Sequence, residues 1–295
     1  MVRWAGAIFA ALFGLAFGSF LNVVLARFPE DESIIHPRSH CRHCDHILAW
    51  WENLPLLSWI LLRGRCRQCH AGIGVRYPLV ELAIGVLWTA CWLRFGPPQI
   101  GEIGDIRVHI PTAYSMTQVV GYALLCWLLL ALAALDAEFF WLPDVLTLPG
   151  IALGIVFTLT LARLQWGGPA SLLESAQSCG LAVVAAGGLI LIIRLAYWLV
   201  RSVEGMGLGD AKLMAMLAAW LGLRGALECF AIAIFAAAAA AFVWLGVLAI
   251  RRETSGWGKM PLPLGTFLCA AAITQLFYSH WLTAPMHLEL LGLGR

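Results

Sequence analysis

Three aspartates stand at the ends of long apolar runs, where a charged side chain is costly. Asp136 directly follows one apolar run, and Asp144 follows Pro143 just before another. Asp210 follows the glycine-rich segment 205–209, whose glycines would allow an extended backbone to approach closely. Ionisable residues at membrane depth are expensive and are by default candidates for a functional site.

Paired carboxylates suit the hydrolysis of a peptide bond. Two like charges held close together cannot both ionise, so the pair shares one proton. One carboxylate can then take a proton from water while the other hydrogen-bonds the scissile carbonyl.

A structural role must be weighed against this chemistry. An aspartate at a helix start is often only an N-cap, which could explain Asp144 and Asp210 taken singly. Asp136 stands at a helix C-terminus, where the helix dipole disfavours an anion, so a cap does not explain it. A functional pair of carboxylates is therefore favoured over three coincidences.

Four clustered cysteines form two CxxC pairs, Cys41 with Cys44 and Cys66 with Cys69. Two such pairs at about this spacing are typical of a single tetrahedral zinc site. Structural zinc is the favoured interpretation, because a metal would stabilise a segment that has few large aliphatic residues. A redox-active dithiol and unliganded thiols stay open as alternatives. Nearby histidines could replace a cysteine as ligand, namely His36, His40, His43, His46 and His70.

The composition predicts a chain that lies in membrane lipid. Hydrophobic residues make up 61% of the 295 residues and charged residues only 12%, and the mean hydropathy is +0.83. A soluble domain carries about 25% charged residues. The net charge of +2 is too small to favour nucleic acid as a partner. Eight apolar runs meet or approach the roughly 20 residues of a membrane span, at 4–27, 79–96, 117–135, 145–163, 177–200, 211–223, 226–250 and 262–282.

We therefore predict an all-α polytopic membrane protein of about eight transmembrane helices, with a small cytosolic four-cysteine zinc-binding insertion. Cytoplasmic loops carry an excess of Lys and Arg, and the basic segments are 29–78, 200–212 and 251–259. With eight spans these segments fall on one side together with the loop 136–144, which places the aspartates at the cytosolic face. The expected organisation is a first helix at 1–28, the insertion at 29–78 and a peptidase domain at 79–295.

Several motifs resemble those of the type IV prepilin peptidases, which are GxGD-type membrane aspartyl proteases. Segments 136–144 and 207–212 look like the two aspartate signatures of that family, and 18–24 is similar to its amino-terminal motif. The CxxC pairs, with segments 52–55 and 76–81, resemble those of its bifunctional bacterial members. All these motifs follow the family's order along the chain.

The resemblance implies a leader peptidase that cleaves type IV prepilins or type II secretion pseudopilins after a glycine, at the cytoplasmic face of the bacterial inner membrane. By motif position, Asp136 and Asp210 are the catalytic pair, and the supporting residues are Asp144, Gly207, Gly209 and Lys212. The bifunctional members also methylate the new amino terminus with S-adenosylmethionine. Candidates for that cofactor site are Glu52, Asn53, Arg76 and Glu81, and the structural zinc would be held by Cys41, Cys44, Cys66 and Cys69.

Three alternative functions stay open. A different GxGD intramembrane protease, similar to presenilin or signal-peptide peptidase, would share the aspartates but not the cysteine insertion. A transporter with an Asp-based ion relay would place its carboxylates near mid-bilayer in broken helices, whereas these aspartates stand at span ends. A membrane-anchored zinc module that only binds would show no cleavage by the purified protein.

Overall fold

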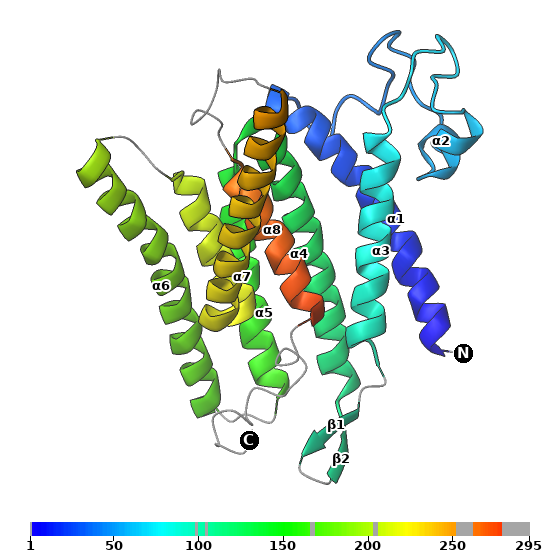
Figure 1. Cartoon of the computed structure of the whole chain (residues 1–295). Coiled ribbons are helices and arrows are strands. Elements are labelled where there is room, and N and C mark those ends of the chain that lie inside the picture. Colours follow the sequence, from blue (N-terminus) through cyan, green and yellow to red (C-terminus); the bar gives the residue numbers. More distant parts are fainter. Residues whose placement is uncertain are drawn as a thin grey trace. The chain divides into compact units, whose positions relative to one another are not determined.

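The chain folds mainly into long apolar helices. The computed structural model describes residues 2–97, 100–103, 106–165, 169–202, 206–251 and 262–278. Among these residues, six helices are long and apolar enough to cross a membrane, which confirms the predicted fold class (Figure 1). The long helices are α1 (Val2–Arg27), α3 (Arg76–Phe95), α4 (Thr112–Phe139), α5 (Asp144–Leu164), α6 (Pro169–Arg201) and α7 (Leu208–Arg251), and the shorter α8 spans Leu264–Tyr278.

The two predicted spans at 211–223 and 226–250 lie in one element, α7, which is broken at Gly222. The Gly222 backbone has φ 73° and ψ 173°, a conformation that only glycine adopts readily. The break divides α7 into segments 208–221 and 223–251. Each of the eight predicted apolar runs therefore corresponds to a helical segment, as far as the described residues extend.

A short hairpin departs from the predicted all-helical chain. Strands β1 (Ile100–Ile103) and β2 (Ile106–His109) pair antiparallel, with Ile100 opposite His109. Each strand has only four residues, too few to give a reliable alternating pattern in the sequence. The all-α prediction is incomplete at this point.

The residues cluster into two compact units, and α4 contributes to both. The first unit comprises residues 1–99 and 118–127, which include α1, α3 and the insertion between them. Within it α1 packs along α3 (Figure 1). The two backbones approach so closely that a Cβ atom added at Gly18 would lie 2.6 Å from Cα of Glu81. Small residues at such contacts are typical of helix pairs in lipid.

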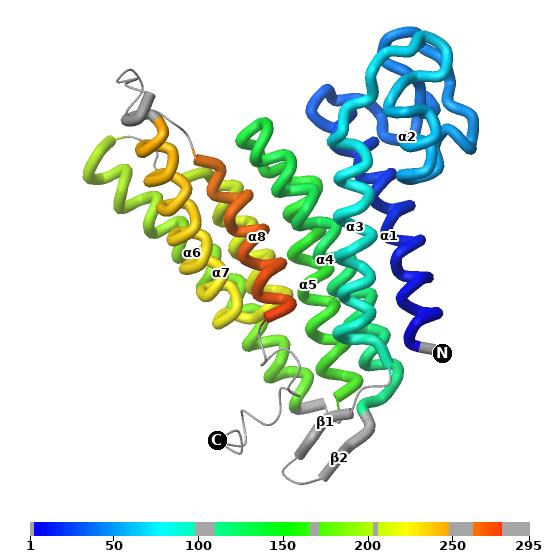
Figure 2. Tube along the Cα trace, turned by 45° about the vertical axis from the view of Figure 1, so that its right-hand side comes forward, coloured from blue at the N-terminus to red at the C-terminus, as the bar shows by residue number. Residues whose placement is uncertain are grey.

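The second unit comprises residues 100–117 and 128–295. Within it α7 packs against α5, α6 and α8 (Figure 2). Trp220 anchors α7 on α5, because its indole Nε1 donates a 2.8 Å hydrogen bond to the carbonyl of Gly150. This packing fixes the first segment of α7, which carries Asp210.

The insertion between α1 and α3 consists of loops and three short helical pieces. These are η1 (Phe28–Glu30), η2 (Trp50–Asn53) and α2 (Leu57–Leu61). The predicted boundaries at residues 28 and 78 fall beside the end of α1 and the start of α3. The functional division that they describe stays a prediction.

Candidate active sites and metal centre

Asp136 lies in the last turn of α4 and is only 6% exposed. Its Oδ2 accepts a hydrogen bond from the backbone N–H of Thr266, at 2.7 Å, and lies 3.1 Å from the Thr266 hydroxyl. Thr266 is in the first turn of α8, so the carboxylate faces the positive end of that helix. The start of α8 thereby offsets the unfavourable position of an anion at the end of α4.

Asp210 is half-buried in the first turn of α7. Its Oδ2 accepts a 3.2 Å hydrogen bond from the N–H of Gly207, the contact that a carboxylate at the third helical position makes in a capping box. The preceding segment is held from α6, where the Arg194 guanidinium donates a 2.7 Å hydrogen bond to the Met206 carbonyl. A capping role for Asp210 is therefore present, whatever else this carboxylate does.

The structure brings Asp136 and Asp210 together, although they are far apart in the sequence. A Cβ atom added at Gly265 would lie 2.9 Å from Asp136 Oδ2, and Gly209 directly precedes Asp210 in the chain. Leu142, in the loop between α4 and α5, packs against the starts of α7 and α8. Cβ atoms added at Gly209 in α7 and at Gly265 in α8 would lie 2.9 Å and 3.0 Å from its side chain. The end of α4 and the starts of α7 and α8 therefore converge.

Asp144 and Lys212 form an ion pair beside this point. Pro143 occupies the N-cap of α5, so a capping role for Asp144 is wrong. Asp144 Oδ1 instead accepts a 2.5 Å hydrogen bond from Lys212 Nζ. Both side chains are partly exposed, and the pair ties the start of α5 to the start of α7.

The two predicted supporting glycines differ in what they do. A Cβ atom at Gly209 would lie 2.9 Å from Cβ of Leu142, too close for any larger residue without movement. A Cβ atom at Gly207 would make only an ordinary contact, 3.5 Å from Asp210 Oδ2. Close packing requires glycine at position 209, whereas the role of Gly207 is its backbone N–H.

Thr266 is a site residue that the sequence reasoning missed. It ends the segment 261–266, which reads Pro-Leu-Pro-Leu-Gly-Thr. Proline, glycine and a hydroxyl residue before an apolar run are signals of a helix start. They predict where α8 begins, but they do not predict which carboxylate its N–H groups meet.

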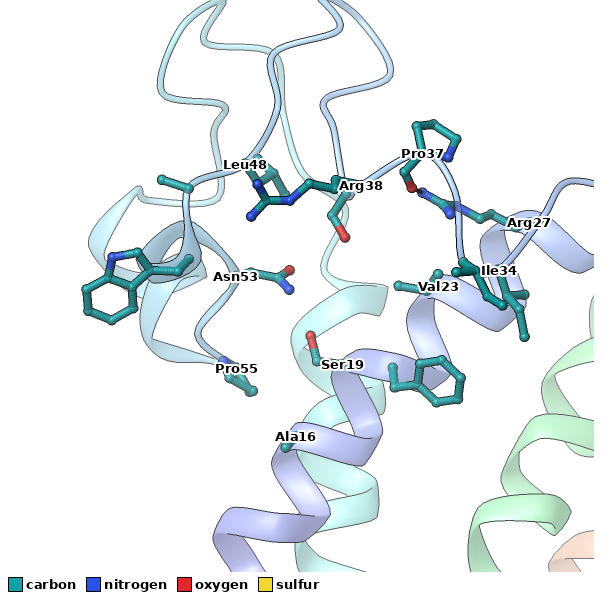
Figure 3. A pocket seen from close by; sticks show the side chains of 15 residues that line it. Ala16, Ser19, Val23, Arg27, Ile34, Pro37, Arg38, Leu48, Asn53 and Pro55 are labelled. Atoms are coloured by element: carbon teal, nitrogen blue, oxygen red, sulfur yellow. Dashed lines mark hydrogen bonds between the residues drawn. The ribbon is translucent and has the colours of Figure 1, made fainter.

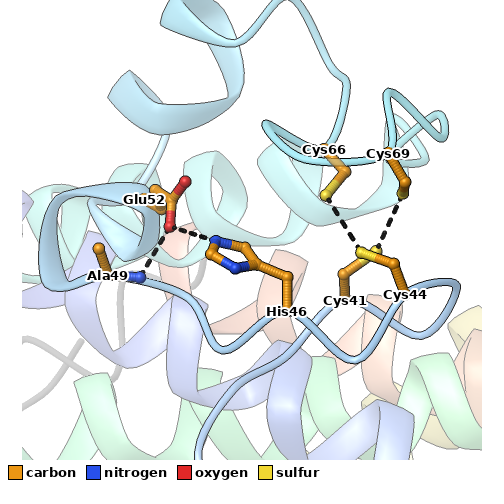
Figure 4. Close-up of polar contacts among 7 residues, drawn as sticks. All are labelled: Cys41, Cys44, His46, Ala49, Glu52, Cys66 and Cys69. Carbon is orange, nitrogen blue, oxygen red and sulfur yellow. Dashed lines mark hydrogen bonds and ion pairs between the residues drawn. The ribbon is translucent and has the colours of Figure 1, made fainter.

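The four cysteines of the insertion gather in one cluster. Their Sγ atoms all lie within 4.8 Å of one another. Cys41 and Cys69 are 3.8 Å apart, and Cys44 and Cys66 are 3.9 Å apart (Figure 4). A tetrahedron with zinc–sulfur bonds of about 2.3 Å separates its sulfurs by about 3.8 Å. The cluster therefore has the ligand chemistry and the spacing to hold one metal ion.

The same local turn closes both CxxC pairs. The residue after each pair, Asp45 or His70, has a left-handed φ of 54° or 57°. This turns the chain back, so that the N–H of Cys41 bonds the His46 carbonyl as the N–H of Cys66 bonds the Ala71 carbonyl. Among the described residues no histidine joins the four sulfurs as a ligand candidate.

Two adjoining cavities lie in the first unit, between α1 and the insertion. Their volumes are about 470 Å³ and about 320 Å³. Figure 3 shows Ser19 of α1 and Asn53 of the insertion at the larger cavity, and both residues also line the smaller one. The smaller cavity is lined in addition by the buried carboxylates of Glu52 and Glu81.

The side chain of Glu52 is fully buried, and among the described residues only one of its two carboxylate oxygens has hydrogen-bond partners. Its Oε2 accepts a 2.7 Å hydrogen bond from the N–H of Ala49 and lies 3.1 Å from Nε2 of His46 (Figure 4). The Ala49 N–H, together with the His46 ring, lowers the pKa of Glu52 below its ordinary value. These two contacts favour the ionised form of the buried carboxylate.

Three of the four residues predicted for the cofactor site line this cavity, namely Glu52, Asn53 and Glu81. Glu81 is buried near the start of α3, where its Oε2 accepts a 2.8 Å hydrogen bond from the N–H of Leu56. Arg76 begins α3, is exposed and lies outside the lining of this cavity. The structure thus brings three of these residues together at the cavity, and Arg76 is next in the chain to Tyr77, which also lines it.

The residues of the cavity fit a ligand of the S-adenosylmethionine type. That molecule carries a positively charged sulfonium and an ammonium group, which buried carboxylates complement. Among the described residues, Glu52 Oε1 is buried without a hydrogen-bond partner. A buried acceptor left in this way is rare in a folded protein and is free to accept from a molecule bound in the cavity.

Comparison with known proteins identifies the family. The model of the bacterial peptidase A24 N-terminal domain matches residues 12–95, and that of the type IV leader peptidase family matches residues 123–242. A prepilin leader peptidase/N-methyltransferase of Burkholderia pseudomallei (strain 1026b) is 36% identical, over 96% of this chain and 88% of that protein. Proteins of the same name from Myxococcus xanthus and Aeromonas hydrophila are 40% and 35% identical, over 75% and 92% of this chain and 58% and 90% of their own lengths.

No solved structure matches the chain. The family match confirms the resemblance predicted from the motifs and covers both the cysteine insertion and the aspartate segments. The chain therefore belongs to the type IV leader peptidase family, as an enzyme of its leader peptidase/N-methyltransferase type.

Proposed function

We propose that this protein cleaves the leader of type IV prepilins or type II secretion pseudopilins, using Asp136 and Asp210 as the catalytic pair, and then methylates the new amino terminus. The observation that carries the peptidase proposal is the convergence, around Leu142, of the end of α4 that bears Asp136 and the start of α7 that bears Asp210. The relatives' names support prepilins as the substrate class, and pseudopilins are added from the family resemblance.

The expected cleavage step uses one carboxylate as a base and the other as an acid. The base removes a proton from water, the water oxygen bonds to the scissile carbonyl carbon, and the carbonyl electron pair moves to its oxygen. The protonated carboxyl group hydrogen-bonds that oxygen. When the carbonyl re-forms, the carbon–nitrogen bond breaks and the leaving amine takes up the proton.

Methylation would use the first unit. S-adenosylmethionine would supply an electrophilic methyl group, and Glu52, Asn53 and Glu81 would hold it or the amine that receives the methyl group. Zinc at Cys41, Cys44, Cys66 and Cys69 would join the two halves of the insertion, because the four thiolates come from two separate turns. The metal would thus fix the loop that carries Glu52.

The basic segments favour a cytosolic location for both sites in a bacterial inner membrane. An ion-transport role is disfavoured, because Asp136 and Asp210 lie in terminal turns of their helices and not near helix midpoints.

The peptidase proposal is tested with purified protein in detergent and a prepilin substrate. Wild type should shorten the prepilin by its leader, as read by mass spectrometry, whereas Asp136→Ala and Asp210→Ala should each abolish cleavage. Glu174→Ala, an exposed carboxylate of α6, is the control and should cleave like wild type. Cleavage at wild-type rate by either aspartate variant would exclude the proposed pair.

A further inference from the structure

The buried Glu52 carboxylate presents one oxygen that nothing in the described chain satisfies. Oε2 is used by the Ala49 N–H and the His46 ring, whereas Oε1 has no partner among the described residues. Leaving a buried charged acceptor unpaired costs more than a single hydrogen bond gains. Because Glu52 lines the 320 Å³ cavity, a ligand in that cavity can supply the missing donor.

The cations around this cavity are engaged elsewhere. Arg27 donates to the carbonyls of Ser33 and Pro37, at 2.9 Å and 2.7 Å. Arg67 stacks over the Trp51 ring at 5.1 Å, and its charge reaches Glu52 without giving it a hydrogen bond.

Arg42, also at the cavity, contacts Glu30 at 3.1 Å and the Ala26 carbonyl at 2.6 Å. Glu81 adds a second buried carboxylate to the lining. The cavity therefore retains acceptors for a cationic donor.

We propose that this cavity binds its ligand through a primary ammonium group that donates a hydrogen bond to Glu52 Oε1. The inference rests on the proposed methylation, and it makes Glu52 a recognition residue for a stated chemical group. A sulfonium centre has no N–H, so it does not satisfy Oε1. A primary ammonium supplies both the positive charge and the donor.

Two molecules of the proposed reaction carry such a group. One is the methyl donor, whose amino-acid end has an ammonium. The other is the processed substrate, whose new amino terminus is an ammonium until it loses a proton. Methyl transfer then forms the nitrogen–carbon bond and breaks the carbon–sulfur bond, the bonding electrons remaining on a neutral thioether sulfur.

The test compares ligands with and without a free ammonium group, by calorimetry on the zinc-loaded full-length protein in detergent. The donor arm uses S-adenosylhomocysteine and 5′-methylthioadenosine, which lacks the amino-acid end. The substrate arm uses a mature amino-terminal peptide with a free or an acetylated amine. The variants are Glu52→Gln and, as control, Asp31→Asn, which removes an exposed carboxylate of the same insertion that does not line the cavity.

In one of the two arms, Glu52→Gln should weaken binding of the amine-bearing ligand at least about tenfold. The affinity for the amine-free ligand of that arm should stay unchanged. The arm that shows this difference identifies the source of the ammonium. Asp31→Asn should bind like wild type. The ratio of two affinities is measured on folded protein alone, so partial unfolding of a variant does not alter it.

Unchanged ratios in both arms, with wild type that binds and methylates, would overturn the inference while the methylation proposal stands. If wild type binds none of these ligands and transfers no methyl group, the proposed methylation fails, and the inference fails with it.

Discussion

The two units place their carboxylates by different means. In the second unit Asp136 and Asp210 lie in terminal turns of long helices, and the N–H groups of Thr266 and Gly207 hold them. In the first unit Glu52 lies in a one-turn helix within a loop region, and its fixed position depends on an insertion with few regular elements. Packing of the membrane helices positions the two aspartates. The loops around Glu52 lack such packing and need a local cross-link to hold that carboxylate in place.

We propose that zinc bound by the four cysteines is that cross-link. Hydrogen bonds within each CxxC turn are local, and the Sγ atoms of the two turns lie within 4.8 Å of one another. The difference implies that metal loss should damage the methyltransferase site and leave the peptidase site intact. Each prediction below probes one side of this contrast.

The largest expected effect is from metal removal. Cys41→Ser should lose zinc, measured by metal analysis, and its methylation of a pre-cleaved peptide should fall to background, because structural zinc supplies folding free energy to small metal domains. Cleavage of prepilin by the same variant should stay within about threefold of wild type. Cys179→Ser, a lone cysteine of the second unit, is the matched control. Loss of cleavage together with methylation in Cys41→Ser would break the contrast.

Substitution of Gly265 should affect only cleavage. In Gly265→Ala the new Cβ would lie 2.9 Å from Asp136 Oδ2 and 3.0 Å from Leu142 Cδ1, so the carboxylate must move. A displacement of this size can lower a rate about a hundredfold, and kcat for cleavage should fall by about that factor while methylation is unchanged. Gly180→Ala, where a Cβ meets nothing within 4 Å, should cleave at wild-type rate. Equal rates in the two alanine variants would contradict the geometry.

Thr266 should act as a positioning residue for Asp136. Thr266→Val keeps the backbone N–H and the side-chain shape but removes the hydroxyl 3.1 Å from Oδ2. The hydroxyl has one proton and lies 3.1 Å from both Asp136 Oδ2 and the Ala133 carbonyl. A fully formed hydrogen bond to a charged group contributes about 1.5–3 kcal/mol, so kcat should fall by up to about tenfold with KM unchanged. Thr266→Ser should restore the rate. A rise in KM alone, or no rescue by serine, would assign Thr266 a role in substrate binding or packing instead.

The sequence predicted the helices well because apolar runs of span length leave few alternatives in lipid. It also predicted the cysteine cluster, since two CxxC pairs constrain their own geometry. The sequence did not predict the hairpin of β1 and β2, because strands of four residues each are too short to give a clear pattern.

The missed contacts are those that join elements distant in sequence. Nothing local links Thr266 to Asp136, 130 residues apart, or shows that Leu142 fills the space left by Gly209. Likewise, motif position alone grouped Arg76 with Glu52 and Glu81, and only the structure shows that Arg76 is not among the residues that line the cavity. Side-chain direction on a helix decides such cases, and an isolated motif does not specify it.

The separation of the two chemistries is tested most directly by giving Asp136→Asn two substrates, an intact prepilin and the corresponding mature peptide. With S-adenosylmethionine present, mass spectrometry should show the prepilin uncut and the mature peptide methylated at the wild-type rate. A cut prepilin would contradict the role of Asp136. An unmethylated mature peptide, with zinc still bound to the variant, would contradict the independence of the two sites.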